Sequence, residues 1–176
     1  DGGCPVVIHV DRSVKDAERQ SFEKSLDDLP NVNVLSNHTC EWGTWNLVAA
    51  TQDASMHLLR NYPEVRHVYL TSGSCLPIKP VSQLAAYLAE RPETDFIESV
   101  STKDMPWTVG GLNDERFTLW FPLSWRQNRR LFDASVKVQR KLKAQRALPA
   151  KIQPHLGSQW WCLTRRTLSA ILEDPK

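Results

Sequence analysis

Short apolar runs alternate with longer segments of helical periodicity along this chain of 176 residues. Five runs, most of them rich in β-branched or apolar residues, predict strands over residues 6–10, 32–35, 66–71, 94–98 and 158–163. The segments around them predict helices, over 13–29, 44–62, 80–91, 126–143 and from 164 onward. Strands that alternate with helices favour an α/β fold with a mainly parallel sheet and flanking helices.

Single residues predict where several of these helices begin. Ser13, Thr44 and Thr164 each stand where a hydroxyl could cap a helix, and Pro80 stands at the start of another. The stretch of residues 99–124 is rich in Trp, Gly and Pro and is expected to be irregular.

Ligands of open α/β sheets bind beyond the carboxyl ends of the strands. This rule selects Asp11, the loop of residues 72–79 and Glu98 as candidates. Asp11 could accept a hydrogen bond from a nucleoside or could cap the following helix, and both interpretations stay open. Arg116 lies among the aromatic residues Trp107, Phe117 and Trp120, a combination that suits a sugar ring but is also found in protein cores.

Several motifs are absent from the sequence. It contains no GxGxxG, no P-loop, no GxSxG and no HExxH. It also lacks an Asp-x-Asp pair, and its only adjacent aspartates, Asp27 and Asp28, suit a solvated helix face better than a metal site. We therefore expect no metal, and we expect basic side chains to neutralise any nucleotide diphosphate.

Charge is distributed unevenly. The formal net charge is +2, yet residues 126–146 hold eight basic side chains and one acidic side chain, a local net charge of +7. This segment suits a phosphate, an acidic polymer or an anionic membrane surface, and a solvated helix face remains the alternative. The overall composition is that of a globular protein, and no apolar run is long enough to span a bilayer.

The four cysteines stand far apart, without CxxC or zinc-type spacing. Free thiols are the favoured interpretation, and two disulfides are the alternative.

Five blocks of sequence occur in the order found in one known family. They are Val7-Ile-His-Val-Asp11, Trp42-Gly43-Thr44-Trp45 with Val48 and Ala50, Leu70-Thr-Ser-Gly73 with Leu76-Pro-Ile-Lys79, Phe96-Ile-Glu98, and Gly157-Ser-Gln-Trp-Trp161. Together they resemble the Core-2/I-branching β-1,6-N-acetylglucosaminyltransferases and the related xylosyltransferases, in a form typical of bacterial members.

The resemblance implies a GT-A-like, Rossmann-like glycosyltransferase domain without Asp-x-Asp. It implies an inverting, metal-independent transfer of a sugar, N-acetylglucosamine or alternatively xylose, from a UDP-sugar to an oligosaccharide or polysaccharide hydroxyl. No cofactor is expected. The residues that it assigns are Asp11, Ser72 and Gly73 on the donor side, and Glu98, Arg116 and Trp160 on the acceptor side. A non-catalytic domain that binds carbohydrate or nucleotide sugar is the alternative.

The family's catalytic base is a Glu in a Pro-Asp-Glu block that would follow Lys176. We therefore expect residues 1–176 to be an internal part of one glycosyltransferase domain and assign no catalytic residue. No nucleic-acid partner is expected, and residues 126–146 could touch a membrane surface. The expected location is the cytoplasm, peripheral to a membrane, with the Golgi lumen as the alternative for a eukaryotic protein.

Overall fold

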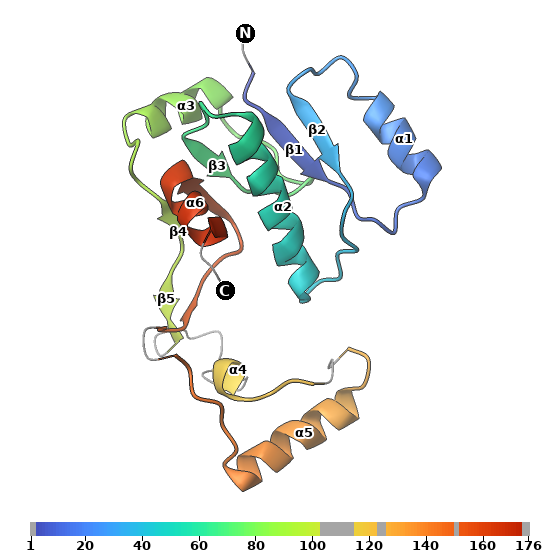
Figure 1. Ribbon diagram of the computed structural model, residues 1–176, viewed down its shortest axis with the longest axis vertical. Helices are drawn as coiled ribbons and strands as arrows, with labels where there is room; N and C mark the ends of the chain where they lie inside the picture. Colours follow the sequence, from blue (N-terminus) through green and yellow to red (C-terminus); the bar gives the residue numbers. More distant parts are fainter. Residues whose placement is uncertain (1–2, 103–114, 123–125, 150–151, 174–176) are drawn as a thin grey trace. The chain divides into compact units, whose positions relative to one another are not determined.

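The computed structural model describes residues 3–102, 115–122, 126–149 and 152–173. Within these ranges the elements are, in chain order, β1 (Val6–His9), α1 (Asp16–Lys24), β2 (Val32–Leu35), α2 (Trp45–Asn61), β3 (His67–Tyr69), α3 (Val81–Ala89), β4 (Phe96–Ile97), β5 (Val100–Ser101), α4 (Glu115–Thr118), α5 (Arg129–Leu142), β6 (His155–Leu156), β7 (Trp161–Thr164) and α6 (Arg165–Glu173) (Figure 1). None of the described helices is long and apolar enough to cross a bilayer.

The chain forms two compact units. The first unit comprises residues 1–97 and 160–176, and the second unit comprises residues 98–159. The first unit therefore receives its last strand and helix from the far end of the sequence.

The pair β1 and β2 confirms the expected parallel pairing. Residues 6–9 pair in register with residues 32–35, from Val6 opposite Val32 to His9 opposite Leu35. The connection between the two strands contains α1, as expected for parallel neighbours, which need a crossover. The helix α2 packs against β1.

The prediction of a mainly parallel sheet was wrong. The second sheet of the first unit has the order β3-β7-β4, and β7 is antiparallel to both neighbours. The strands β3 and β4 run in the same direction, and the crossover through α3 joins them, as expected. The strand between them, however, arrives from the far end of the chain and runs the other way. Strand and helix alternation cannot reveal such an insertion.

The junction between β7 and α6 is held by hydrogen bonds to three other elements. The backbone N–H of Arg165 donates to the carbonyl of Arg66 at 2.7 Å, just before β3. Its guanidinium donates to the carbonyls of Leu59 and Tyr62, at the C-terminal end of α2. A cation bound to the last carbonyls of a helix also complements the helix dipole.

Asp95 completes this junction from the start of β4. Its Oδ1 accepts from the Thr164 N–H, and its Oδ2 accepts from the Thr167 hydroxyl, both at 2.6 Å. Burial raises the pKa of Asp95, but the hydrogen bonds from Thr167 and Thr164 outweigh it, and the net pKa is lowered. Thr164 also caps α6 as predicted, because its Oγ1 accepts from the Thr167 N–H at 3.3 Å.

The core of the first unit lies against the same junction. Val68 of β3, Leu163 of β7 and Leu168 of α6 are buried together. Leu58 and Leu59 of α2 pack against this cluster, with Val65 and Trp161. The helix α2 thus contacts α6 as well as β1.

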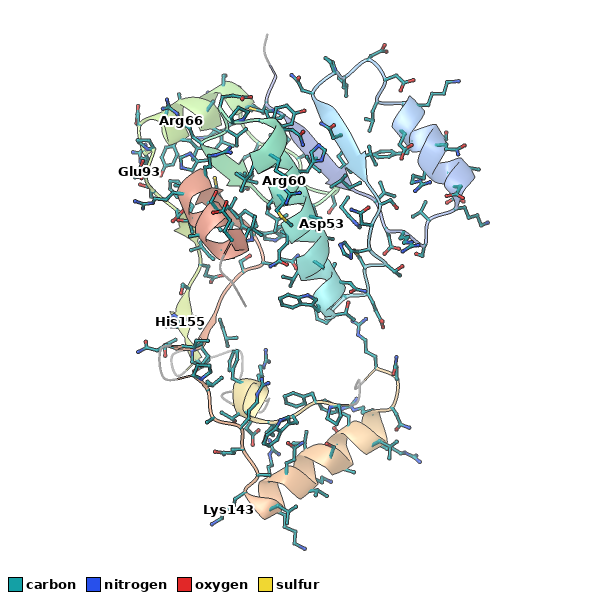
Figure 2. The ribbon with its side chains drawn as sticks, in the orientation of Figure 1. Asp53, Arg60, Arg66, Glu93, Lys143 and His155 are labelled. Atoms are coloured by element: carbon teal, nitrogen blue, oxygen red, sulfur yellow. The ribbon has the colours of Figure 1, made fainter. Side chains whose placement is uncertain are left out.

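In its described residues, the second unit contains a short strand pair and two helices. The strands β5 and β6 pair antiparallel, with Val100 opposite Leu156, and the Ser99 hydroxyl lies 3.0 Å from Nδ1 of His155 (Figure 2). The helix α5 confirms the predicted helix in the basic segment. The prediction that residues 99–124 are irregular missed β5 and α4, which are too short to show a period.

Several helix and strand starts differ from prediction. Thr44 stands at the N-cap of α2, but its hydroxyl donates to the Glu41 carbonyl and does not cap the helix. Ser13 does not cap α1, which begins at Asp16 with Lys15 as its N-cap. The reason is that the Ser13 hydroxyl donates to Asp11 Oδ1 at 2.6 Å, so the chain first makes a turn at residues 11–14. The last strand begins at Trp161 rather than residue 158.

We expect Asp95→Asn to lower the free energy of unfolding by about 1–3 kcal/mol, because an amide cannot accept at both positions and leaves one donor unsatisfied. Urea unfolding of the purified protein measures this change. The control is Glu93→Gln, whose side chain is exposed and only 3.5 Å from the exposed Arg166, so about 0.5 kcal/mol or less is expected. Equal stability of the two variants would contradict the role of Asp95.

Candidate functional site

Asp11 lies just beyond β1, where its carboxylate binds two segments of backbone. Oδ1 accepts from the N–H and the hydroxyl of Ser13, at 2.7 and 2.6 Å. Oδ2 accepts from the N–H of Cys40 at 2.6 Å, in the loop after β2. Asp11 therefore holds the two loops that follow the paired strands β1 and β2.

These hydrogen bonds keep Asp11 ionised. The pKa of its carboxyl is lowered, first by the Ser13 hydroxyl and then by the N–H groups of Ser13 and Cys40. The helix-cap interpretation is wrong, since α1 begins at Asp16 with Lys15 as its N-cap. The role of Asp11 toward a donor nucleoside stays a prediction.

Ser72 and Gly73 lie in the loop after β3, as predicted. The Ser72 hydroxyl lies 2.9 Å from the Ser74 hydroxyl and 3.3 Å from the Cys75 sulfur. The hydrogen bond from Ser72 is the largest of several that lower the pKa of the exposed Cys75 thiol to about 7. Among the described residues, no hydrogen bond joins this loop to Asp11.

Glu98 meets the block Gly157-Ser158 within the second unit. Its Oε2 accepts from the Ser158 N–H at 2.7 Å. A Cβ on residue 157 would lie 2.0 Å from the Glu98 carbonyl oxygen, far closer than a non-bonded carbon and oxygen can approach. Residue 157 must therefore be glycine so that the two segments can approach, and the approach fixes the Glu98 carboxylate on one side.

Arg116 lies on α4, which α5 holds in place. The Arg140 guanidinium makes two hydrogen bonds to Glu115, and this pairing lowers the pKa of the Glu115 carboxyl. Arg146 donates to the carbonyls of Phe117 and Thr118. Trp160, the third acceptor candidate, is 39% exposed and belongs to the first unit, just before β7.

A cluster of polar side chains that sequence reasoning missed lies beside Asp11. The rings of His9 and His38 stack with centroids 5.8 Å apart, and the N–H of His38 donates to His9 Nε2 at 3.2 Å. His38 Nε2 lies 2.8 Å from Asp53 on α2 (Figure 2). His9 belongs to a block quoted above, whereas His38 and Asp53 follow no pattern that the sequence displays.

The pKa of His9 is lowered by burial first, and then by the neighbouring His38 ring, while Asp11 and Asp53 act in the opposite direction. Neutral His9 has an acceptor at Nε2, which the His38 N–H uses. A proton on Nε2 would turn that acceptor into a donor and break the hydrogen bond.

Two further findings concern metals and thiols. No group of three or more His, Cys, Asp or Glu side chains in the described ranges could hold a metal ion. All four cysteines are free thiols, as favoured above. Burial raises the pKa of Cys162 to about 11, so this core thiol is not a nucleophile near neutral pH.

The fold is mixed α/β, with acidic residues after β1 and β4 and with two distant motif blocks joined at Glu98. The family model described as Core-2/I-Branching enzyme matches residues 6–176, and the chain belongs to this family. The resemblance identified from five blocks is thereby confirmed. No curated protein matches the chain significantly.

We expect Gly157→Ala to lower the free energy of unfolding by about 1–3 kcal/mol, because the new methyl group would force Glu98 and β6 apart. Urea unfolding followed by far-UV circular dichroism measures this effect. The matched control is Gly73→Ala, since a Cβ at residue 73 meets nothing within 4 Å. If both variants are as stable as wild type, the close approach at Gly157 is not a constraint.

We also expect His9 to make the fold less stable as the pH falls below 6.5, its ordinary pKa. Because its folded-state pKa is lowered, the unfolded chain binds more protons between 6.5 and that lower value, so acid favours unfolding in this window. The carboxyls of Asp11 and Asp53, whose pKa values are lowered from 3.8, stay ionised there.

Melting temperatures at about pH 7.5 and about pH 5.5 test this expectation. His9→Gln keeps an acceptor for the His38 N–H but does not titrate. Its melting temperature should therefore fall less between the two pH values than that of wild type. His9→Ala also removes the acceptor, so its melting temperature should be lower than that of wild type at both pH values. Equal losses in wild type and His9→Gln would refute the assignment.

Proposed function

We propose that this protein transfers a sugar, N-acetylglucosamine in the first instance, from a UDP-sugar to a hydroxyl of an oligosaccharide or polysaccharide. The acceptor hydroxyl attacks the anomeric carbon from the face opposite UDP, so the configuration inverts. The bond to UDP breaks with its electron pair, and the hydroxyl proton passes to a carboxylate base. No residue of this chain is assigned that role.

The observation that carries this proposal is the arrangement of Glu98. One oxygen of its carboxylate is fixed by the Ser158 N–H. Among the described residues, the other oxygen, Oε1, has no hydrogen-bond donor. Glu98 is exposed, so Oε1 is available to accept from a sugar hydroxyl. A carboxylate held on one side and open on the other suits the orientation of an acceptor.

Arg116 is proposed as a second acceptor contact within the second unit, and Trp160, which belongs to the first unit, stays an acceptor contact implied by the resemblance. A guanidinium donates to sugar oxygens, and an indole face packs on the apolar face of a sugar ring. The hydrogen bonds from Arg140 and Arg146 to α4 support this role for Arg116, because they fix the helix that carries it.

Asp11, Ser72 and Gly73 are the proposed donor contacts. A carboxylate has about four lone-pair positions, so Asp11 can accept from uridine while it holds Ser13 and Cys40. The exposed loop at Gly73 leaves room for a ligand, since nothing lies within 4 Å of a Cβ there. Metal independence rests on the missing Asp-x-Asp, and xylose remains the second candidate sugar.

The experiment is UDP release by the purified full-length protein, with UDP-N-acetylglucosamine and UDP-xylose as donors and a panel of oligosaccharide acceptors. We expect acceptor-dependent release that persists in EDTA. Release that EDTA abolishes and manganese restores would overturn metal independence. Tight sugar binding without release from any donor would instead favour a non-catalytic domain.

We expect Glu98→Gln to raise the acceptor KM by roughly 5- to 100-fold, because a charged hydrogen bond becomes a neutral one. The UDP affinity, measured by calorimetric titration, should stay within about twofold of wild type, since the change touches no proposed donor contact. Glu90→Gln, at the exposed end of α3, is the matched control. Loss of UDP binding in folded Glu98→Gln protein would refute the acceptor assignment.

A further inference from the structure

The outer surface of α5 presents two parallel stripes. Arg130, Lys137 and Lys141 form an exposed basic stripe at spacings of seven and four residues. Each is followed directly by an exposed apolar residue, Leu131, Val138 and Leu142, which are 53%, 55% and 71% exposed. Residues at these spacings lie on one face of a helix, so the two stripes run side by side along its length.

The core of the second unit does not use the apolar stripe. The inner face of α5 is formed by Phe132, Val136 and Gln139. Phe132 stacks on Phe121 with ring centroids 5.6 Å apart, and Val136 is buried. The Gln139 amide bonds both the N–H and the carbonyl of Trp120 at 2.9 Å. Packing within the second unit therefore accounts for the residues of the inner face, but it does not account for the exposed apolar residues of the outer face.

The basic stripe also forms no ion pair with the described residues of the second unit. In the described part of the chain, α5 forms ion pairs through Arg140, with Glu115, and through Arg129, with Asp133. Both arginines lie outside the stripe. Since residues 126–146 contain a single acidic residue against eight basic ones, the segment attracts anions as a whole.

We propose that the outer face of α5 docks on the surface of an anionic lipid bilayer. In such docking, apolar side chains enter the boundary between headgroups and acyl chains, and neighbouring basic side chains bind anionic headgroups. Lys and Arg suit this position because their apolar stems lie along the buried surface while the charge stays in the headgroup layer.

The apolar stripe decides between a membrane and an acidic polysaccharide. A soluble polyanion would be bound by the basic stripe alone, and Leu131, Val138 and Leu142 would then stay exposed to water without a role. A bilayer buries them and binds the charges together. With 14 residues, α5 is about 21 Å long and would lie along the surface rather than across the bilayer.

The test is co-sedimentation of the protein with phosphatidylcholine vesicles that contain about one third phosphatidylglycerol, beside vesicles of phosphatidylcholine alone. We expect binding to the anionic vesicles and little to the neutral ones. Reversal of the basic stripe, in Arg130→Glu/Lys137→Glu/Lys141→Glu, should reduce binding on the order of 100-fold. The apolar variant Leu131→Gln/Val138→Gln/Leu142→Gln should reduce it at least about tenfold.

The matched control is Lys15→Glu/Lys24→Glu/Arg60→Glu, which changes the net charge equally with exposed residues of the first unit. It should stay within about threefold of wild type. Thermal melts establish that each variant is folded, and the apolar variant provides an independent test should the charge variant fail to fold.

Binding of wild type and of both variants to a soluble anionic polysaccharide is measured as well. The proposal is overturned if wild-type protein does not sediment with anionic vesicles. It is also overturned if the apolar variant binds them as wild type does while the basic variant loses affinity for vesicles and polysaccharide alike, because the face would then bind polyanions only.

Discussion

The hydrogen-bonded junction at Thr164 and Arg165 is the interaction on which the first unit depends. At this point β7 passes into α6, and Arg66, Asp95 and the end of α2 all bind the same few residues. The junction explains how a strand from the far end of the chain can occupy the centre of a sheet, because the partners of that strand are fixed at the position where it ends. The cluster of Val68, Leu163 and Leu168 adds apolar burial beside it.

Carboxylates at the ends of strands have two kinds of role here, and the number of their oxygens without a protein donor distinguishes the two. Both oxygens of Asp95 and both of Asp11 already bind N–H or hydroxyl donors of the protein. Glu98 binds one N–H and, within the described residues, leaves Oε1 without a donor. A ligand that approaches Glu98 thus replaces water, whereas one that approaches Asp11 must share oxygens that already hold two loops.

Sequence patterns predicted β1, β2, α2, α3 and α5 closely, because each has a clear period or a boundary residue such as Pro80. They failed where local order depends on distant partners. The direction of β7 follows from its insertion between β3 and β4, and Ser13 is drawn away from α1 by Asp11. At the site, the motif blocks identified Glu98 and Gly157 separately, and only the fold shows why the second must be glycine. The cluster of His9, His38 and Asp53 joins a strand, a loop and a helix, and no local pattern encodes such a contact.

The two faces of α5 have different roles in the second unit: one side contacts the rest of the unit, and the other is exposed. Arg140 and Arg146 hold α4 through Glu115 and Phe117, Gln139 binds Trp120 just after this helix, and α4 carries Arg116. The outer face carries exposed apolar side chains and basic side chains that form no ion pair among the described residues. Since a helix is rigid over 14 residues, a surface that binds the outer face also fixes the orientation of α4. If Arg116 binds the acceptor, as proposed above, docking of α5 on a bilayer would set the direction from which that acceptor approaches.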